Sequence, residues 1–445
     1  MSRPIFSSPS LPRLSPEEYV VGFQEGFSGV RAPENADARV RALFRERNDV
    51  APKVADISTD VPSRVGVAGA GLMGVSIAST FLNARIGVAL YDASREALET
   101  ARERVYRELL VQRARRGNSL DDEKEERRYA QKLVDELLTP TSELDVLAAD
   151  EFIVESIPEK LKLKTKFYRE LESRATTKLV VLTNTSSLRV SDLSATLSDD
   201  ENARVSKKRF CAFHFFHPVA KRDLLEIVPS SEASDETLAR AVALARSVGK
   251  LPIVSGDGPG FLVNRLLQAY LNRSLQFLDA GLPPERLEEI CLRMGMEAPP
   301  LRVVDEIGVD VAARAGWSFF KAFPERAQMT NSLPDLLTEG RLGRKTRRGF
   351  YRYESTTSWA NDAVLDYRSP NVPNFADESD ETIARAIFAD VLTEGKLIIE
   401  EGIARTYREV DAGLVLALGF PRRLGGIFYF ASASSELGDE VVERA

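Results

Sequence analysis

The sequence predicts an α/β protein in which a mostly parallel, doubly wound sheet is followed by a helical region. Three observations lead to this fold class. Short β-branched runs alternate with helical segments from Arg64 to about residue 255, which is typical of a parallel sheet. A glycine-rich turn follows the first of these runs. After Gly256 the strand signals stop, and helical patterns continue to Ala445.

The composition is that of an ordinary globular protein. Its 445 residues fit about three domains, and a formal net charge of −7 with 43% hydrophobic residues predicts neither disorder nor nucleic acid as the main partner. Cys211 and Cys291 are too few for a disulfide framework and have no CxxC spacing, so we expect a reducing, cytoplasmic compartment and no metal site. The chain contains no apolar run of about 18 residues, so we expect no membrane partner.

Seven strands are predicted in the sheet domain, which spans residues 61–255. Each is a short apolar run between segments with helical spacing. The predicted strands are Val65–Ala68, Ile86–Tyr91, Phe152–Val154, Leu179–Leu182, Phe210–Phe216, Leu224–Val228 and Pro252–Val254. A highly charged segment from Arg95 to about Leu138 separates the second strand from the third, and we expect it to form a helical hairpin with solvated faces.

The regions on either side of the sheet domain differ from each other. Residues 1–60 are Pro- and Ser-rich, contain one short amphipathic stretch near residues 36–44, and are predicted to be an extension or linker. In the helical region, Phe261–Gly281 and Ile383–Gly402 have the same amphipathic design, and each precedes an acidic helix start and a Pro-containing turn. This internal repeat predicts two copies of one helical domain, at residues 256–360 and 361–445.

The strongest local motif is GAGLMG, a GxGxxG turn between the first strand and the next helix. In such a turn Gly69 allows the tight bend, Gly71 lets the backbone approach a pyrophosphate, and Gly74 allows close helix packing. Asp92 ends the second strand, where a carboxylate binds the hydroxyls of an adenosine ribose. It also repels a 2′-phosphate, so NAD is favoured over NADP despite the nearby Arg95. The alternative is a purely structural turn.

The chain has only two histidines, His214 and His217, both in the segment RFCAFHFFHP. Strand alternation separates His214 from Cys211 and His217, so these three side chains cannot converge on a metal while the strand is extended. Glu226 lies on the next predicted strand and could pair with one histidine. A histidine oriented by a carboxylate can act as a general base. The alternative is a buried imidazole with a structural role.

Together these motifs resemble the 3-hydroxyacyl-CoA dehydrogenase family from about Arg64 to the end of the chain. HFFHP at 214–218 is similar to the family's HFFNP, NTSSL at 184–188 is a family motif, and GPGFLVNRLL at 258–267 resembles the family's domain junction. The catalytic residues that the resemblance implies are His214 as the base, Glu226 as its partner, Ser186 as the contact of the substrate hydroxyl, and Asn264 as a further polar residue.

The resemblance also implies the fold and the cofactor. It predicts a Rossmann-type NAD-binding domain followed by two tandem all-α domains like the C-terminal domain of 6-phosphogluconate dehydrogenase. The segments VESIPEKLKLK and GRKTRRGFYRY resemble family segments that contact the cofactor. The implied NAD contacts are Gly69, Gly71, Leu72, Met73, Gly74, Asp92, Ser156, Glu159, Lys164, His217 and Lys345. For the two lysines the alternative is a solvated surface position.

The sequence departs from the family pattern at two places. His217 stands where the family has Asn, which adds a second titratable group beside the nicotinamide. APPL at 298–301 replaces the common MGP and changes the expected shape of the acyl pocket. For the anionic phosphates of CoA, the predicted hairpin offers several arginines whose alternative role is a solvated helix face. They are Arg107, Arg113, Arg115 and Arg116.

The activity implied is NAD-dependent oxidation of (S)-3-hydroxyacyl-CoA to 3-oxoacyl-CoA in fatty-acid β-oxidation. The tandem repeat resembles the dehydrogenase portion of multifunctional β-oxidation proteins, and the residues before the sheet domain are too few for a hydratase domain. We therefore expect a dehydrogenase that works beside a separate hydratase and thiolase, as a monomer or homodimer. Two alternatives are a 3-hydroxybutyryl-CoA dehydrogenase of a short-chain pathway and a non-catalytic NAD-binding homologue.

Overall fold

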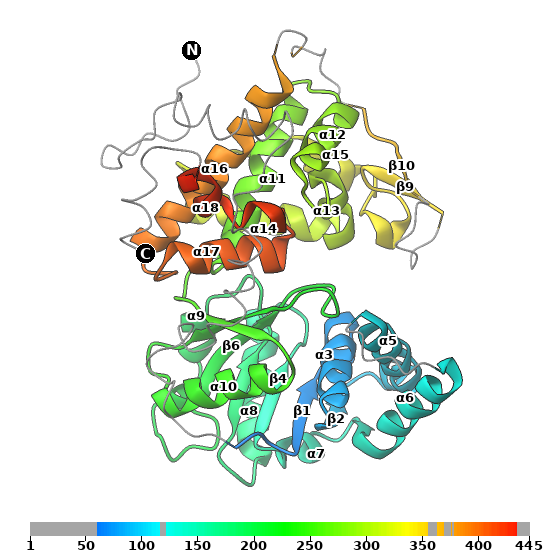
Figure 1. Ribbon diagram of the computed structural model, residues 1–445. Coiled ribbons are helices and arrows are strands. Elements are labelled where there is room, and N and C mark those ends of the chain that lie inside the picture. Colours follow the sequence, from blue (N-terminus) through cyan, green and yellow to red (C-terminus); the bar gives the residue numbers. More distant parts are fainter. Residues whose placement is uncertain (1–59, 116–121, 355–362, 369–374, 376–377, 434–445) are drawn as a thin grey trace. The chain divides into compact units, whose positions relative to one another are not determined.

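The computed structural model describes residues 60–115, 122–354, 363–368, 375 and 378–433 (Figure 1). They form two compact units, one reaching to Phe261 and the other beginning at Leu262. The amphipathic stretch predicted near residues 36–44, together with Arg116, lies outside the described residues.

The first unit is built on an eight-stranded sheet in the order β3-β2-β1-β4-β5-β6-β7-β8. Its strands are β1 (Arg64–Ala68), β2 (Gly87–Tyr91), β3 (Leu138–Thr141), β4 (Phe152–Glu155), β5 (Val180–Thr183), β6 (Phe210–Phe215), β7 (Leu224–Pro229) and β8 (Leu251–Val254). Neighbouring strands run parallel, except that β6 and β7 are antiparallel. The mostly parallel sheet predicted from the alternating pattern is confirmed, and all seven predicted strands are present within one or two residues.

Helices cover both faces of this sheet, which is why its strands read as nearly continuous apolar runs. One core packs α3, α5, α6 and α10 against the sheet, and the other packs α7, α8 and α9. The helix bounds are α3 (Leu72–Asn83), α4 (Arg95–Glu99), α5 (Ala101–Arg115), α6 (Glu123–Leu137), α7 (Leu144–Ala148), α8 (Leu161–Arg174), α9 (Val190–Ser194) and α10 (Asp235–Ser247).

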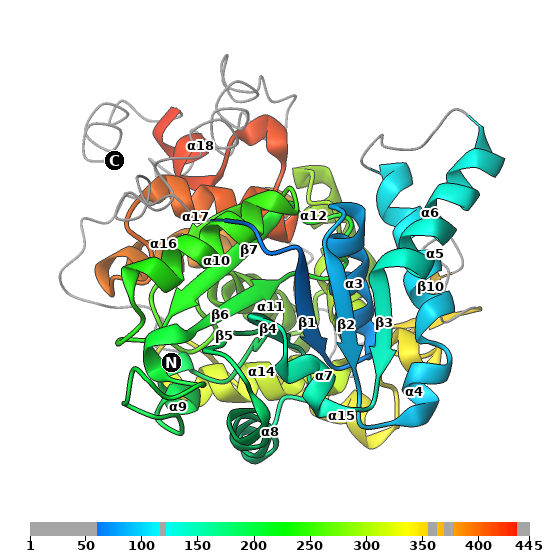
Figure 2. The ribbon, with the colours of Figure 1, turned by 90° about the horizontal axis from the view of Figure 1, so that it is seen from below.

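The charged segment forms the predicted helical hairpin, made of α5 and α6. Figure 2 shows it beside β3, at the edge of the sheet where β1, β2 and β3 lie side by side. The strand β3 was not predicted, because it is a short edge strand that contains Pro140 and two threonines and follows α6 directly. Within the hairpin, Arg113 is buried and its guanidinium binds Glu126 and, at 3.2 Å, Asn83 Oδ1. A structural role therefore replaces the CoA contact considered for Arg113.

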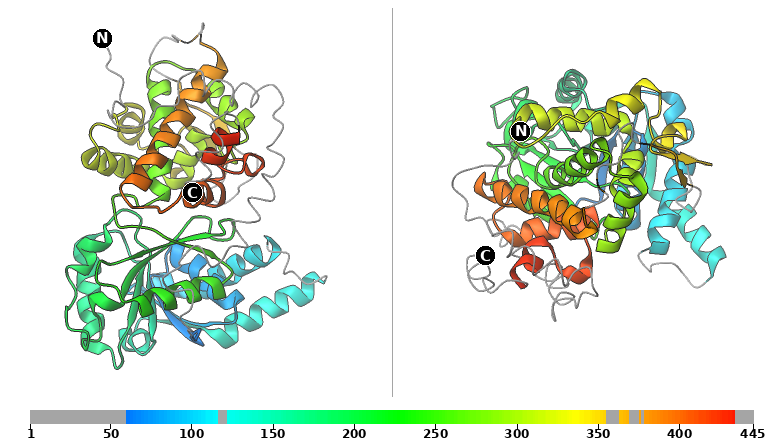
Figure 3. Two further views of the ribbon diagram at one scale, coloured as in Figure 1. Left: turned by 60° about the vertical axis from the view of Figure 1, so that its left-hand side comes forward. Right: turned by 90° about the horizontal axis from the view of Figure 1, so that it is seen from above.

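The second unit is mainly helical. Its helices are α11 (Val263–Asp279), α12 (Pro284–Met294), α13 (Pro300–Ile307), α14 (Val309–Ala322), α15 (Ser332–Thr338), α16 (Asp380–Glu400), α17 (Tyr407–Gly413), the π-helical segment η4 (Leu414–Leu418) and α18 (Ile427–Ala433). The long helices α11 and α16 lie side by side (Figure 3). They run antiparallel, because Arg265 near the start of α11 binds Glu394 and Glu401 near the end of α16, each at 2.6 Å.

Two features complete the second unit. The strands β9 (Tyr351–Tyr353) and β10 (Ala363–Leu365) form an antiparallel pair, so the prediction that no strand follows Gly256 is wrong here. Three residues are too few to reveal a period of two in the sequence. None of the helices in the described part of the chain combines the length and apolar character needed to cross a bilayer.

Candidate active site

The glycine-rich loop joins β1 to α3. Gly69 has a φ of +101°, where L side chains are strained, and a Cβ there would lie 2.6 Å from the carbonyl oxygen of Ser156. A Cβ at Gly74 would lie 1.7 Å from the carbonyl oxygen of Gly69, so glycine is needed for α3 to pack this closely. A Cβ at Gly71 would meet no atom of the described residues within 4 Å. This open space at the start of α3 fits the pyrophosphate of a dinucleotide.

Asp92 follows β2 and lies against the same loop. Its Oδ2 accepts a hydrogen bond from the amide of Ala70 at 2.8 Å, and its Oδ1 accepts one from the amide of Ser94 at 2.9 Å. These bonds fix the orientation of the carboxylate. Each oxygen keeps a further lone pair, so the group can still bind ribose hydroxyls. The geometry therefore fits the predicted adenosine contact.

Three further predicted cofactor contacts, Leu72, Met73 and Ser156, lie near the glycine-rich loop. Leu72 and Met73 are the first two residues of α3, and Leu72 is exposed. Ser156 follows β4, and its amide donates to the carbonyl of Ala68 at 2.8 Å. Their contacts with the cofactor stay predictions.

His214 and Glu226 lie directly opposite each other on the antiparallel strands β6 and β7. The imidazole Nδ1 is 3.2 Å from the carboxylate Oε2, and both side chains are buried. Because a carboxylate only accepts, Nδ1 carries the hydrogen, and Nε2 of the neutral ring is then the acceptor. Strand pairing holds this arrangement in place before any ligand binds.

Side-chain alternation along β6 follows the prediction. Phe213 and Phe215 belong to the core on one face of the sheet, and Ala212 belongs to the core on the other. His214 shares the face of Ala212, with its ring 6.0 Å from that of Phe261. Among the described residues no group of three His, Cys, Asp or Glu side chains is arranged to hold a metal ion.

His217 lies beyond the end of β6. It is exposed, and its peptide bond to Pro218 is cis. Its role beside the nicotinamide stays a prediction.

The motif NTSSL forms the loop between β5 and α9 and brings Ser186 to the histidine. Ser186 Oγ lies 3.1 Å from His214 Nε2. The side-chain oxygen of Asn184 accepts a hydrogen bond from the amide of Phe215 at 2.8 Å, which ties the loop to β6. Ser186, His214 and Glu226 therefore form a continuous row of hydroxyl, imidazole and carboxylate, which we call the polar row.

Glu159, an implied NAD contact, binds the NTSSL loop. Its Oε1 accepts hydrogen bonds from the amides of Ser186 and Ser187, both at 2.9 Å, and of Leu188 at 3.3 Å. The hydroxyl of Thr185 donates to the same oxygen at 2.5 Å. One carboxylate thus fixes the backbone of the loop that contains Ser186.

Lys164 is fully buried, so the alternative of a solvated surface lysine is wrong for this residue. Its Nζ lies 2.6 Å from Oε1 of Glu155 and 3.3 Å from Oε2 of Glu159. The hydroxyls of Tyr168 and Thr183 donate to the other oxygen of Glu155, each at 2.7 Å. Burial by itself would raise the pKa of Glu159, but the Lys164 ammonium and the hydrogen bonds from the loop lower it to about 2.

Two models of one family match the chain. The NAD binding domain of 3-hydroxyacyl-CoA dehydrogenase matches residues 64–258, and the C-terminal domain of the same enzyme matches residues 260–353. The chain belongs to the 3-hydroxyacyl-CoA dehydrogenase family. The predictions of the family, of the Rossmann-type domain with a helical C-terminal region, and of NAD as the cofactor are confirmed.

The similar proteins differ in how much of the chain they cover. The fatty acid oxidation complex subunit alpha of Vibrio parahaemolyticus is 32% identical over 368 residues, which are 82% of this chain and 50% of that protein. The chain thus spans about half the length of this curated relative. The crystal structure of (S)-3-hydroxybutyryl-CoA dehydrogenase from Ralstonia eutropha has a TM-score of 0.57 and 27% identity, covering 66% of this chain and 100% of its own.

A third similarity extends over more of the helical region. The dehydrogenase part of a multifunctional enzyme from Caenorhabditis elegans has a TM-score of 0.55 and 24% identity, and it covers 90% of this chain and 88% of its own. At this level of identity the similarity shows a shared fold.

Two residues that the 3-hydroxyacyl-CoA dehydrogenase resemblance implied belong to the second unit. Asn264 is the second residue of α11. Lys345 lies in the 3-10 turn Arg344–Thr346, and its Nζ pairs with Asp310. The roles of Asn264 and Lys345 stay predictions.

Sequence reasoning missed Ser255, which the fold brings to the polar row. Its hydroxyl donates to Oε1 of Glu226 at 2.9 Å, and the residue is buried. The only sequence signal is a serine directly after the apolar strand LPIV. That signal does not identify its partner, because the contact depends on the register between β7 and β8.

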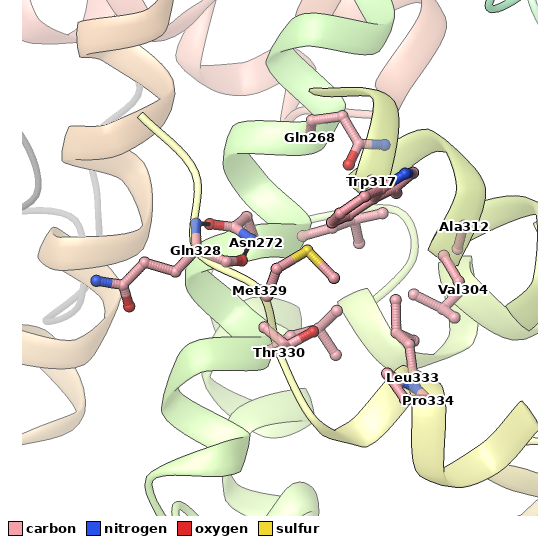
Figure 4. A pocket seen from close by; sticks show the side chains of 14 residues that line it. Gln268, Asn272, Val304, Ala312, Trp317, Gln328, Met329, Thr330, Leu333 and Pro334 are labelled. Carbon is pink, nitrogen blue, oxygen red and sulfur yellow. Dashed lines mark hydrogen bonds between the residues drawn. The ribbon is translucent and has the colours of Figure 1, made fainter. Parts of the chain in front are cut away.

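The second unit contains a separate, largely apolar pocket between α11, α14 and α15 (Figure 4). Trp317 and Met329 line it and are about half exposed. The side-chain amide of Asn272 donates to the carbonyl of Gln328 at 2.6 Å, which supports one wall. None of the described residues that line the pocket has an ionisable side chain, so they offer no acid–base chemistry.

Proposed function

We propose that this chain catalyses the NAD-dependent oxidation of (S)-3-hydroxyacyl-CoA to 3-oxoacyl-CoA in fatty-acid β-oxidation. The proposal rests on the polar row, in which His214 lies between the Ser186 hydroxyl at 3.1 Å and the Glu226 carboxylate at 3.2 Å. Oxidation of an alcohol needs a base that removes the hydroxyl proton, and an imidazole held by a carboxylate can take that proton.

The glycine-rich loop and Asp92 hold the cofactor in this proposal. Bound NAD supplies the acceptor for the hydride that leaves C3 of the substrate. The Ser186 hydroxyl orients the substrate hydroxyl toward Nε2 of His214, and Nε2 takes its proton. The Nδ1 hydrogen then bridges to Glu226, whose negative charge stabilises the imidazolium. The negative charge of Asp92 favours NAD over NADP.

The organisation that we propose has a linker at 1–60, the NAD-binding domain at 61–255, and two copies of a helical domain at 256–360 and 361–445. Equivalent carboxylates support the repeat. Glu288 of α12 accepts from the amide of Leu301 at 2.9 Å near the start of α13, and Asp411 of α17 accepts from the amide of Phe428 at 2.9 Å near the start of α18. In both copies an acid on the second helix binds the beginning of the next helix.

The turns after these helices also correspond. Gly295 follows α12 and Gly419 follows η4, and both are left-handed. The two turns contact each other, since the amide of Glu297 donates to the carbonyl of Gly419 at 3.0 Å. Contacts between equivalent segments are what a pair of domains related by a local twofold axis produces. A second copy in the same chain can replace a partner subunit, so we propose a monomer, with a homodimer as the alternative.

We further propose a cytoplasmic location and a functional association with a hydratase and a thiolase, because their reactions supply the hydroxyacyl thioester and consume the oxoacyl thioester. The name of the Vibrio parahaemolyticus relative supports a place in fatty acid oxidation. The Ralstonia eutropha structure favours a second candidate, a short-chain 3-hydroxybutyryl-CoA dehydrogenase. Comparing kcat/KM for C4 and C16 substrates separates the two.

The decisive experiment is His214→Ala assayed with acetoacetyl-CoA and NADH. We expect kcat to fall by at least roughly a hundredfold, as is usual when a general base is removed. Near-wild-type turnover would rule out the assigned base. If the wild-type protein fails to oxidise NADH with 3-oxoacyl-CoA substrates of every chain length, the non-catalytic alternative is correct.

A further inference from the structure

We infer that Ser255 is a positioning residue of the dehydrogenase site: its hydroxyl orients the Glu226 carboxylate toward His214. This inference rests on the proposed function, because it assumes that the polar row takes part in catalysis. It adds a fourth side chain to that row, taken from the strand next to β7.

Strand register fixes where Ser255 lies. The strands β7 and β8 are parallel, with Glu226 opposite Ile253 and Ile227 opposite Val254. The amide of Ser255 donates to the carbonyl of Ile227 at 2.9 Å, which extends the pairing by one residue beyond β8. The backbone of Ser255 is therefore held at a set position beside Glu226.

The two oxygens of the Glu226 carboxylate face different partners. Oε2 lies 3.2 Å from Nδ1 of His214, and Oε1 accepts the hydrogen bond from Ser255 Oγ at 2.9 Å. Ser255 is 3% exposed and Glu226 is fully buried, so water does not readily take the place of this hydroxyl. The four groups Ser186, His214, Glu226 and Ser255 thus form one continuous chain of contacts.

This contact has two physical consequences for Glu226. The terminal torsion of a glutamate is broad, and a donor on one oxygen restricts the rotation that would turn the other away from the imidazole. The hydroxyl also gives a buried carboxylate oxygen a donor at a place that water does not readily reach. Both effects act on Glu226 and reach the substrate only through His214. Loss of the hydroxyl should therefore lower kcat and leave substrate binding nearly unchanged.

The test compares Ser255→Val with Ser255→Thr, because these side chains have similar volumes and differ by the hydroxyl. We expect Ser255→Val and Ser255→Ala to lower kcat with acetoacetyl-CoA and NADH roughly tenfold, with both KM values within about twofold of wild type. Ser255→Thr should keep kcat within about threefold. Circular dichroism melting of each variant reports whether it folds.

Ser230→Ala is the matched control. Ser230 is also buried and follows β7 directly, but its hydroxyl donates to the carbonyl of Lys207 at 2.8 Å. We expect this variant to keep wild-type kcat. A second arm places Ser255→Ala in a Glu226→Gln background, where we expect less than a twofold further loss, because a residue that acts through Glu226 is not additive with it.

The outcomes separate the two proposals. Wild-type kcat in folded Ser255→Val, equal losses in the Val and Thr variants, a loss confined to KM, or a full tenfold loss in the Glu226→Gln background would each overturn the role of Ser255. If His214→Ala is inactive in the same assays, the proposed function stands even when the Ser255 inference fails. If His214→Ala is active, the proposed function fails first.

Discussion

Glu159 binds the backbone of Ser186: its Oε1 accepts the Ser186 amide at 2.9 Å, in the loop that places Ser186 Oγ 3.1 Å from His214 Nε2. The Glu159 carboxylate thus acts on the proposed reacting atoms through Ser186, whether or not it also contacts NAD. Its contribution to the site is testable because the two roles affect different kinetic constants.

We predict that Glu159→Gln lowers kcat with acetoacetyl-CoA roughly tenfold or more and leaves KM for NADH within about threefold. All the loop donors bind one oxygen, Oε1, and the other oxygen lies 3.3 Å from Lys164 Nζ. A neutral amide accepts these hydrogen bonds more weakly and turns its NH₂ group toward the Lys164 ammonium, so the loop loses its fixed conformation. Steady-state kinetics with each substrate varied in turn measures both constants. A higher KM for NADH with unchanged kcat would show instead that cofactor contact dominates.

The lowered pKa of Glu159 also predicts a pH dependence of stability. The ordinary value of 4.5 applies in the unfolded chain, and the folded value is about 2. The stabilisation is therefore fully present above about pH 4.5 and is lost as the pH falls toward 2. Urea unfolding from pH 3 to pH 7 should show wild type and Glu159→Gln converging at the acid end. A difference independent of pH would contradict this assignment.

We predict that Lys164→Met destabilises the protein by about 3–5 kcal/mol, because it leaves the buried carboxylate of Glu155 without its ammonium partner. Lys166→Met on the same helix is the control, since Lys166 is mostly exposed and its ion pair with Glu170 is at the surface. That change should stay within about 0.5 kcal/mol. Equal unfolding midpoints for the two variants would show that the buried ion pair is not needed.

The raised pKa of Glu288 predicts a pH dependence of stability opposite to that of Glu159. Burial raises its pKa to about 7 from the ordinary 4.5, although the amide of Leu301 and the hydroxyl of Tyr351 donate to it. Because the folded protein holds this proton more tightly than the unfolded chain, the contribution of Glu288 to stability falls as the pH rises from about 4.5 to 7. Glu288→Gln should remove this part of the decline.

The control for Glu288 is Glu289→Gln on the same helix, because Glu289 is mostly exposed. Urea unfolding of the three proteins at pH 5 and pH 7.5 gives the comparison. We expect the Glu289 variant to match the stability of wild type at both pH values. The Glu288 variant should become more stable relative to wild type at pH 7.5 than at pH 5. Parallel behaviour of all three would exclude a raised pKa at Glu288.

The position of Asp92 predicts a preference for NADH over NADPH. Wild type should use NADH with a higher kcat/KM than NADPH, and Asp92→Asn should move that ratio toward NADPH by roughly tenfold, because the charge that repels a 2′-phosphate is lost. The Asn side chain keeps an oxygen for only one of the two amides that Asp92 accepts, from Ala70 and Ser94. Equal efficiency of the wild-type protein with NADH and NADPH would refute this role.

Much of the fold was readable from local patterns. The period of two along Phe210–Phe215 predicts that His214 and Cys211 lie on opposite faces of the sheet. In the structure Cys211 belongs to one core, and Ala212, on the face of His214, belongs to the other. The edge strand β3 was missed because half-exposed, Pro-containing edges lack that pattern. The buried position of Lys164 was also not readable, since a lysine in a charged helix is usually solvated.

The sequence by itself determined the α/β class and the glycine-rich turn, because these depend on periodicity along the chain and on motif spacing. The resemblance of its motifs to the family then implied the pairing of His214 with Glu226. Only the tertiary structure decided that Glu159 fixes the Ser186 loop, that Lys164 neutralises Glu155, and that Ser255 reaches Glu226. Each of these contacts joins residues from different elements of the sheet domain. Strand order and register bring them within hydrogen-bond distance, and neither is written in any single segment of the sequence.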